Sequence, residues 1–129
     1  MAQVKIYGRR EFLTLKRQAI SDAIHQTIVE VLKFPQEKRY HRFIGLAAED
    51  YLVPSDKSPD YLIIEIQLMT GRSTATRKTL IKTLFAALSS ALGIRVTDLE
   101  IVLFESPPEN WGFRGITGDE AVLNYSITV

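Results

Sequence analysis

The chain has 129 residues, which is the length of one domain with a single hydrophobic core, so we expect residues 1–129 to form one unit. Sixteen lysines and arginines against fifteen aspartates and glutamates give a formal net charge of +1, too small an excess for a nucleic-acid-binding face. The absence of cysteine excludes disulfides, a thiolate nucleophile and a Cys-based zinc site, and the sequence has neither an export signal nor a membrane-spanning apolar run. We therefore expect a cytoplasmic protein.

The first part of the chain predicts a strand, a long helix and a second strand. Apolar and polar residues alternate over residues 3–7, as in a half-buried strand. Apolar residues recur at helical spacing from Leu13 to Leu32, and Pro35 follows as a helix terminator. Alternation resumes over residues 39–46 and predicts the second strand.

The second part of the chain repeats this order. A loop rich in Pro, Ser and Asp covers residues 49–60 and separates the two parts. The apolar segment at residues 61–69 predicts the strongest strand, and apolar residues at helical spacing from Leu80 to Leu92 predict a helix that Gly93 ends. Residues 98–105 predict the returning strand.

Two β-α-β units of similar size predict an α/β fold of the α+β kind, with internal duplication. A right-handed crossover makes the strands of each unit parallel and places both helices on one face of a mixed, mostly four-stranded sheet. No further segment is long enough to cover the other face, and the strands read as apolar on both sides, so we expect other subunits to cover it. The tail, residues 121–129, also alternates and is expected to pair as a strand with a sheet edge.

Segments spread over nearly the whole chain resemble the tautomerase (macrophage migration inhibitory factor) superfamily, and in particular its malonate semialdehyde decarboxylase-like branch. These segments are "QVKIYG", "PQEKRYHRF", "LIIEIQLMTGRS", "DLEIVLFE" and "NWGFRGITGDE". The resemblance implies a β-α-β duplication assembled as a homotrimer with active sites at subunit contacts. It also implies a small-molecule carboxylate as the substrate, with no cofactor. The small net charge and the lack of a membrane-spanning run predict that neither nucleic acid nor a membrane is a partner.

The superfamily's chemistry depends on a proline that becomes the first residue after methionine removal, and here that position is Ala2. The resemblance implies that the α-amine of Ala2 serves as general base or as an imine-forming group once Met1 is removed. A free α-amine has a pKa of about 7.7–8.0, so it needs a pocket that lowers this value to act at neutral pH. The alternative is that Ala2 is simply the first residue of a trimmed chain.

The superfamily's carboxylate-binding arginine corresponds to Arg72 at the predicted start of the second helix, where backbone amides also favour anions. Gly71 and Ser73 fit a tight turn and a helix cap that would direct the guanidinium outward. Trp111 and Phe113 correspond to aromatic residues that line the family's pocket, although such residues are also common in cores.

Two positions depart from the decarboxylase pattern. Lys38 stands where a catalytic aspartate is expected, and Thr70 where a second arginine is expected, so decarboxylase activity is not predicted. Lys38 and Arg39 form either a second cationic contact for substrate or a solvated basic turn. Arg114 is expected to pair with Asp119 or Glu120.

Neither histidine indicates a metal site. His25 is predicted on the polar side of the first helix and His41 within the second strand, with no third ligand at metal spacing.

These observations leave two functional hypotheses. The first is a tautomerase-like enzyme acting on a small 2-oxo or enol carboxylate, with Ala2 and Arg72 as catalytic residues and Lys38, Arg39, Trp111 and Phe113 contacting substrate. The alternative is a trimeric binding or scaffold protein with a degenerate, inactive or weakly active site.

Overall fold

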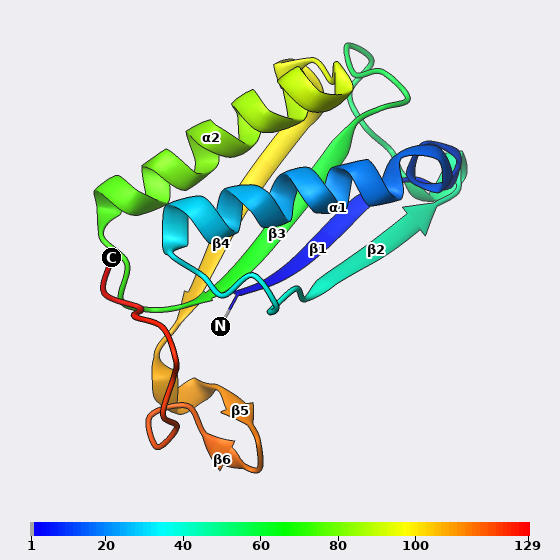
Figure 1. Ribbon diagram of the computed structural model, residues 1–129. Helices are drawn as coiled ribbons and strands as arrows, with labels where there is room; N and C mark the ends of the chain where they lie inside the picture. The colour runs from blue at the N-terminus through cyan, green and yellow to red at the C-terminus, as the bar shows by residue number, and fades with distance from the viewer. Residues whose placement is uncertain (1) are drawn as a thin grey trace.

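The computed structural model describes residues 2–129, and Met1 lies outside the described residues. Two helices cover one face of a four-stranded sheet with strand order β2-β1-β3-β4 (Figure 1). A two-stranded hairpin and three short 3-10 turns complete the fold. In chain order the elements are β1 (Ala2–Arg9), α1 (Arg10–Leu32), β2 (His41–Leu46), η1 (Ala48–Asp50), β3 (Leu62–Met69), α2 (Thr74–Leu92), η2 (Val96–Asp98), β4 (Leu99–Ser106), η3 (Pro108–Asn110), β5 (Gly112–Phe113) and β6 (Ile116–Thr117).

The sheet confirms the predicted duplication. β1 pairs in parallel with β2, β3 pairs in parallel with β4, and the two units join through the antiparallel pair β1–β3. Each parallel pair is connected across one helix, as a β-α-β crossover requires. The antiparallel register sets Ala2 opposite Leu68, so the start of β1 and the end of β3 lie at the same end of the sheet.

The hydrophobic core lies between the sheet and the two helices. Successive side chains of β1 and β3 alternate between the two faces of the sheet, and those that face the helices are almost completely buried. Each such aliphatic side chain contributes about 1.5–3 kcal/mol through burial. The fully buried members include Val4, Ile6, Leu13, Ile20, Ile24, Leu62, Ile64, Ile66, Leu68, Leu80, Leu84 and Leu88.

The opposite face of the sheet is more polar than the sequence pattern predicted. In its centre Glu65 accepts a hydrogen bond from Tyr7 at 3.2 Å and lies 4.0 Å from the ammonium of Lys5. On β4, however, Val102 and Phe104 are 41% and 48% exposed. The prediction of a sheet that is apolar on both sides is therefore wrong, although Val102 and Phe104 form an exposed apolar part of the outer face on β4.

The second helix begins and ends where the sequence predicted caps. The Ser73 side chain accepts a hydrogen bond from the Thr76 amide at 3.1 Å, and Gly93 ends the helix in the left-handed conformation with φ of 68°. The first helix begins at Arg10, earlier than its apolar periodicity indicated. No helix among residues 2–129 has the length and apolarity needed to cross a membrane.

The carboxyl-terminal part departs from the prediction. Residues 121–129 form no strand; instead the tail runs from the β5–β6 hairpin back towards the start of α2 (Figure 1). Its side chains do alternate between half-buried and exposed, with Tyr125 among the half-buried ones. The hairpin itself was not predicted, and its turn depends on two residues with positive φ, Arg114 at 56° and Gly115 at 77°.

Candidate active site

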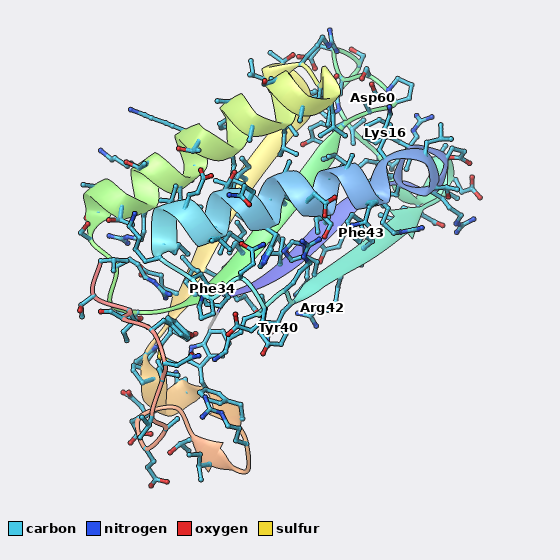
Figure 2. The ribbon with its side chains drawn as sticks, viewed as in Figure 1. Lys16, Phe34, Tyr40, Arg42, Phe43 and Asp60 are labelled. Carbon is cyan, nitrogen blue, oxygen red and sulfur yellow. The ribbon has the colours of Figure 1, made fainter. Side chains whose placement is uncertain are left out.

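Four segments meet at the end of the sheet where β1 starts and β3 finishes. Ala2 begins β1 and is 3% exposed. The segment before β2 joins it there, because the Val4 amide donates to the Tyr40 carbonyl at 2.9 Å. β3 leads at this end into Arg72 and α2, and Figure 2 shows Phe34 and Tyr40 near the point where the tail passes. The fold thus brings Ala2, residues 38–40 and Arg72 to one end of the molecule.

Arg72 is buried rather than directed outward, so the prediction of its orientation is wrong. Its side chain is at the start of α2, and the residue is 4% exposed. Nη1 donates to the Met69 carbonyl at 3.0 Å, whereas Nε and Nη2 have no hydrogen-bond partner within residues 2–129. Burial lowers the pKa of Arg72 below its usual value, and interactions with Tyr125 and Glu105 oppose that shift. Arg72 therefore interacts with the Tyr125 side chain, while its Nε and Nη2 are buried donors with no hydrogen-bond partner among the described residues.

The tail contacts the two residues that flank Arg72 in the sequence. The Ser73 amide donates to the Val129 carbonyl at 3.0 Å. Gly71 has φ of 151°, and a β-carbon there would lie 2.8 Å from the Ile127 carbonyl, so only glycine allows this approach. Close to the same place the Tyr125 ring makes an edge contact with Phe34, with ring centroids 4.9 Å apart.

A groove of about 470 Å³ opens beside this site. Its lining carries two cationic side chains and no carboxylate. The Lys38 ammonium lies 5.1 Å from the centre of the Tyr125 ring, which places Tyr125 next to the groove. The lining residues are Lys38, Tyr40, Phe113, Arg114, Val122 and Asn124.

Arg114 does not make the predicted ion pair. Among the described residues it pairs with neither Asp119 nor Glu120; its Nη1 donates to the Val122 carbonyl at 3.2 Å, and its guanidinium lies 5.1 Å from the centre of the Phe113 ring. These contacts hold the charged group of Arg114 at the groove.

Trp111 and Phe113 occupy different surroundings. Phe113 lines the groove, whereas Trp111 is not among its lining residues. The Trp111 indole donates to the Ser106 carbonyl at 3.2 Å, and its own carbonyl accepts from the Gly118 amide at 2.7 Å. Trp111 therefore ties the hairpin to the end of β4.

Arg39 points towards α1. Its Nη1 donates to Asp22 at 2.7 Å and to the Ser21 hydroxyl at 3.2 Å. It lines a second hollow of about 380 Å³ together with Gln3, Tyr40, His41 and Arg42. Arg39 thus fixes the segment that carries Lys38 instead of facing the larger groove.

Both histidines contribute contacts between α1 and the segment that carries Lys38. His25 is 1% exposed, so its predicted place on the polar side of the helix is wrong, and its Nε2 lies 2.7 Å from the Gln36 carbonyl. The Ser21 hydroxyl lies 2.8 Å from His41 Nδ1. Burial is the main cause that lowers the pKa of His41 to about 4, and the neighbouring charges of His25 and Arg39 contribute to the shift. Among the described residues no group of three His, Cys, Asp or Glu side chains could hold a metal ion.

The sequence reasoning missed Tyr125 and Phe34. Tyr125 interacts with Arg72, just before α2, and with Phe34 and Lys38 in the segment between α1 and β2. It therefore connects the tail to both of these segments. The alternation of the tail does place Tyr125 on its inward side. The same alternation also predicts strand pairing, so it does not identify Tyr125 as a neighbour of Arg72.

The comparison with known families decides the relationship. The family model described as "Tautomerase enzyme" matches residues 38–114, which is more than half of the chain. The chain belongs to the tautomerase family. The match spans the Lys38 segment, Arg72 and Phe113, all of which lie at the candidate site.

Curated relatives of this tautomerase-family protein agree. The probable tautomerase YusQ of Bacillus subtilis (strain 168) is 24% identical over 118 residues, covering 88% of this chain and 93% of that protein. The 2-hydroxymuconate tautomerase of Pseudomonas putida is 32% identical over 56 residues, covering 43% of this chain and 89% of the relative.

Solved structures confirm the fold of this tautomerase-family chain. FG41 malonate semialdehyde decarboxylase inhibited by 3-bromopropiolate has a TM-score of 0.76 at 25% identity, covering 86% of this chain and 88% of that one. A fused 4-OT wild-type asymmetric trimer has a TM-score of 0.80 at 18% identity, with 91% and 96% covered, and this likeness concerns the fold alone.

The depressed pKa of His41 predicts a pH-dependent stability. Between pH 6.5 and about 4 the unfolded chain binds a proton at this position while the folded chain does not, so stability is complete above pH 6.5 and falls as the pH drops towards 4. His41→Gln removes this titration but keeps a partner for Ser21. Urea denaturation from pH 4.5 to 7.5 should show a shallower pH dependence for the variant, by less than about 1.4 kcal/mol per pH unit because His41 is partly exposed. Equal slopes in the two proteins would contradict the burial of a neutral His41.

Proposed function

We propose that this protein catalyses keto–enol proton transfer on a small 2-oxo or enol carboxylate. The observation that carries the proposal is the buried guanidinium of Arg72, which presents two unsatisfied donors at the end of the sheet where the chain begins β1. Membership of the tautomerase family and the activity named for the bacterial relatives support the reaction class.

Arg72 is proposed to bind the substrate carboxylate. A carboxylate accepts two parallel N–H bonds from one edge of a guanidinium, and Nε with Nη2 forms such an edge. The site also lies at the start of α2, where the helix dipole favours an anion. The substrate would thus supply the hydrogen bonds that the protein leaves open.

The α-amine of Ala2 is proposed as the general base, or as a group that forms an imine with a carbonyl compound. This role requires removal of Met1, which lies outside the described residues. The position of Ala2 is buried, and burial would lower the pKa of an amine there below the usual value of about 7.7–8.0. The amine would take a proton from the enol oxygen, or from the carbon beside the carbonyl, and return it at the other position.

The remaining candidate residues are proposed to act around this pair. Lys38 and Phe113 line the groove and would contact the distal part of the substrate. Arg39 and Trp111 are held by Asp22 and by the Ser106 carbonyl, respectively, so we assign them to positioning the Lys38 segment and the hairpin.

One observation favours a second candidate function. Arg72 is closed off by the tail, as expected for a degenerate site in a non-catalytic binding or scaffold protein. The two candidates differ in turnover, and the Arg72 variant below separates them.

We further propose that the protein is a homotrimer. The exposed apolar side chains of Val102 and Phe104 lie on the sheet face that the helices leave uncovered, and trimers are named for the fused 4-OT structures that share the fold. Light scattering should give three times the chain mass, and Phe104→Asp should lower that mass to one chain, whereas the exposed helix variant Lys82→Asp should not. A wild-type monomer or dimer would contradict the proposal.

The role of Arg72 is tested by Arg72→Met, which keeps much of the side-chain volume without the charge. We expect kcat/KM with phenylenolpyruvate to fall about 100-fold, because one charged bidentate contact is lost. The free energy of unfolding should not fall, and should rise by about 1 kcal/mol, because the unsatisfied donors are removed.

Lys78→Ala is the matched control, since it removes an exposed cation from the same helix and should leave both quantities unchanged. Loss of stability in Arg72→Met with unchanged kcat/KM would assign Arg72 a structural role and contradict the proposed function.

The amine is tested by intact-mass spectrometry with phenylpyruvate and borohydride. An imine at Ala2 reduced by borohydride gives one stable adduct, which peptide mapping should locate to residue 2 of a chain without Met1. A variant with Gly-Ser inserted before Ala2 should lose both the adduct at Ala2 and turnover. Full turnover in that variant would contradict a role for the Ala2 amine.

A further inference from the structure

We infer that the tail, residues 121–129, is a gate over Arg72, with Tyr125 as the residue that closes the path from the groove to Arg72. The inference rests on the proposed function, since it concerns access to the same arginine. It assigns a role to a segment that supplies none of the proposed catalytic groups.

The first support is that the tail is attached on each side of Arg72. The Val129 carbonyl accepts from the Ser73 amide, and Ile127 packs against Gly71 so closely that a β-carbon there would not fit. Arg72 itself is 4% exposed. A ligand therefore cannot meet Arg72 unless these contacts open.

The second support is the position of Tyr125 between the groove and Arg72. Lys38, which lines the groove, lies over the Tyr125 ring at 5.1 Å, and Tyr125 interacts electrostatically with the guanidinium of Arg72. The ring also makes an edge contact with Phe34 at 4.9 Å. A carboxylate that enters along the groove therefore reaches Tyr125 before Arg72.

The third support is that Arg72 lacks hydrogen bonds while the tail lies in its present, closed position. Nε and Nη2 of Arg72 have no partner among residues 2–129, although they are buried. The Tyr125 side chain interacts with the guanidinium but leaves Nε and Nη2 without partners, whereas a carboxylate would satisfy both. A ligand that binds only the open state shifts the population towards that state.

The tail is also suited to movement. It lies outside the regular secondary structure, and every second side chain faces solvent. Segments of this kind open locally at lower free energy than core strands. Tyr125 and Ile127 are the half-buried side chains that hold it against Phe34 and Gly71.

The test is the rate at which phenylglyoxal modifies Arg72, followed by peptide mass spectrometry, with the exposed Arg10 as internal reference. We expect slow modification in the wild type and at least a tenfold faster rate in Tyr125→Ala and in Ile127→Ala. Tyr125→Phe keeps the ring contact and should stay slow. Thr128→Ala, an exposed change in the same tail, should match the wild type.

Equal Arg72 rates in the wild type, Tyr125→Ala and Ile127→Ala would overturn the gate. Circular dichroism identifies any variant that does not fold, and two independent tail variants keep the test decisive. Because this labelling needs no turnover, it tests the gate even if the proposed reaction is wrong.

Binding of phenylpyruvate completes the test. Tyr125→Ala should bind about tenfold more tightly than the wild type, because the closed state no longer competes, and unchanged or weaker binding would contradict the gate. Adding Arg72→Met to Tyr125→Ala should abolish that gain. If labelling accelerates but Arg72→Met leaves binding intact, the gate stands and the proposed role of Arg72 fails.

Discussion

A guanidinium buried without its full set of hydrogen bonds is costly, and the architecture around Arg72 is organised about such a group. If Arg72 had no function, an apolar side chain at this position would make the protein at least as stable. Nε and Nη2 have no hydrogen-bond partner among residues 2–129, and we propose that a substrate carboxylate completes their hydrogen bonds. This incomplete burial connects the fold, the tail and the proposed chemistry.

The topology explains why Arg72 and Ala2 lie at the same end of the sheet. Antiparallel pairing of β1 with β3 sets Ala2 opposite Leu68, four residues before Arg72 in the sequence. The first crossover returns the Lys38 segment to the same end, where α1 holds it through Asp22, Ser21 and His25. Ala2, Arg72 and the cationic groove thus come together from segments that are distant in sequence.

Much of the fold was predictable, because each β-α-β unit has strong local periodicity and Ser73 and Gly93 are good helix caps. The family resemblance implied that Ala2, Lys38 and Arg72 belong to one site, and in the structure these residues lie at the same end of the sheet. Neither the burial of Arg72 nor the contacts of the tail with Gly71 and Ser73 were predictable, since they leave no local pattern in the sequence. The alternation of the tail identified the inward side of Tyr125, but alternation alone does not distinguish a sheet partner from a covering segment.

The most direct test of this account is a crystal structure of the protein with bound phenylpyruvate. The account predicts the ligand carboxylate within hydrogen-bond distance of Arg72 Nε and Nη2, with Tyr125 displaced from the position it occupies between Lys38 and Arg72. A ligand bound elsewhere, with the tail still covering an unliganded Arg72, would contradict both the assigned site and its gate.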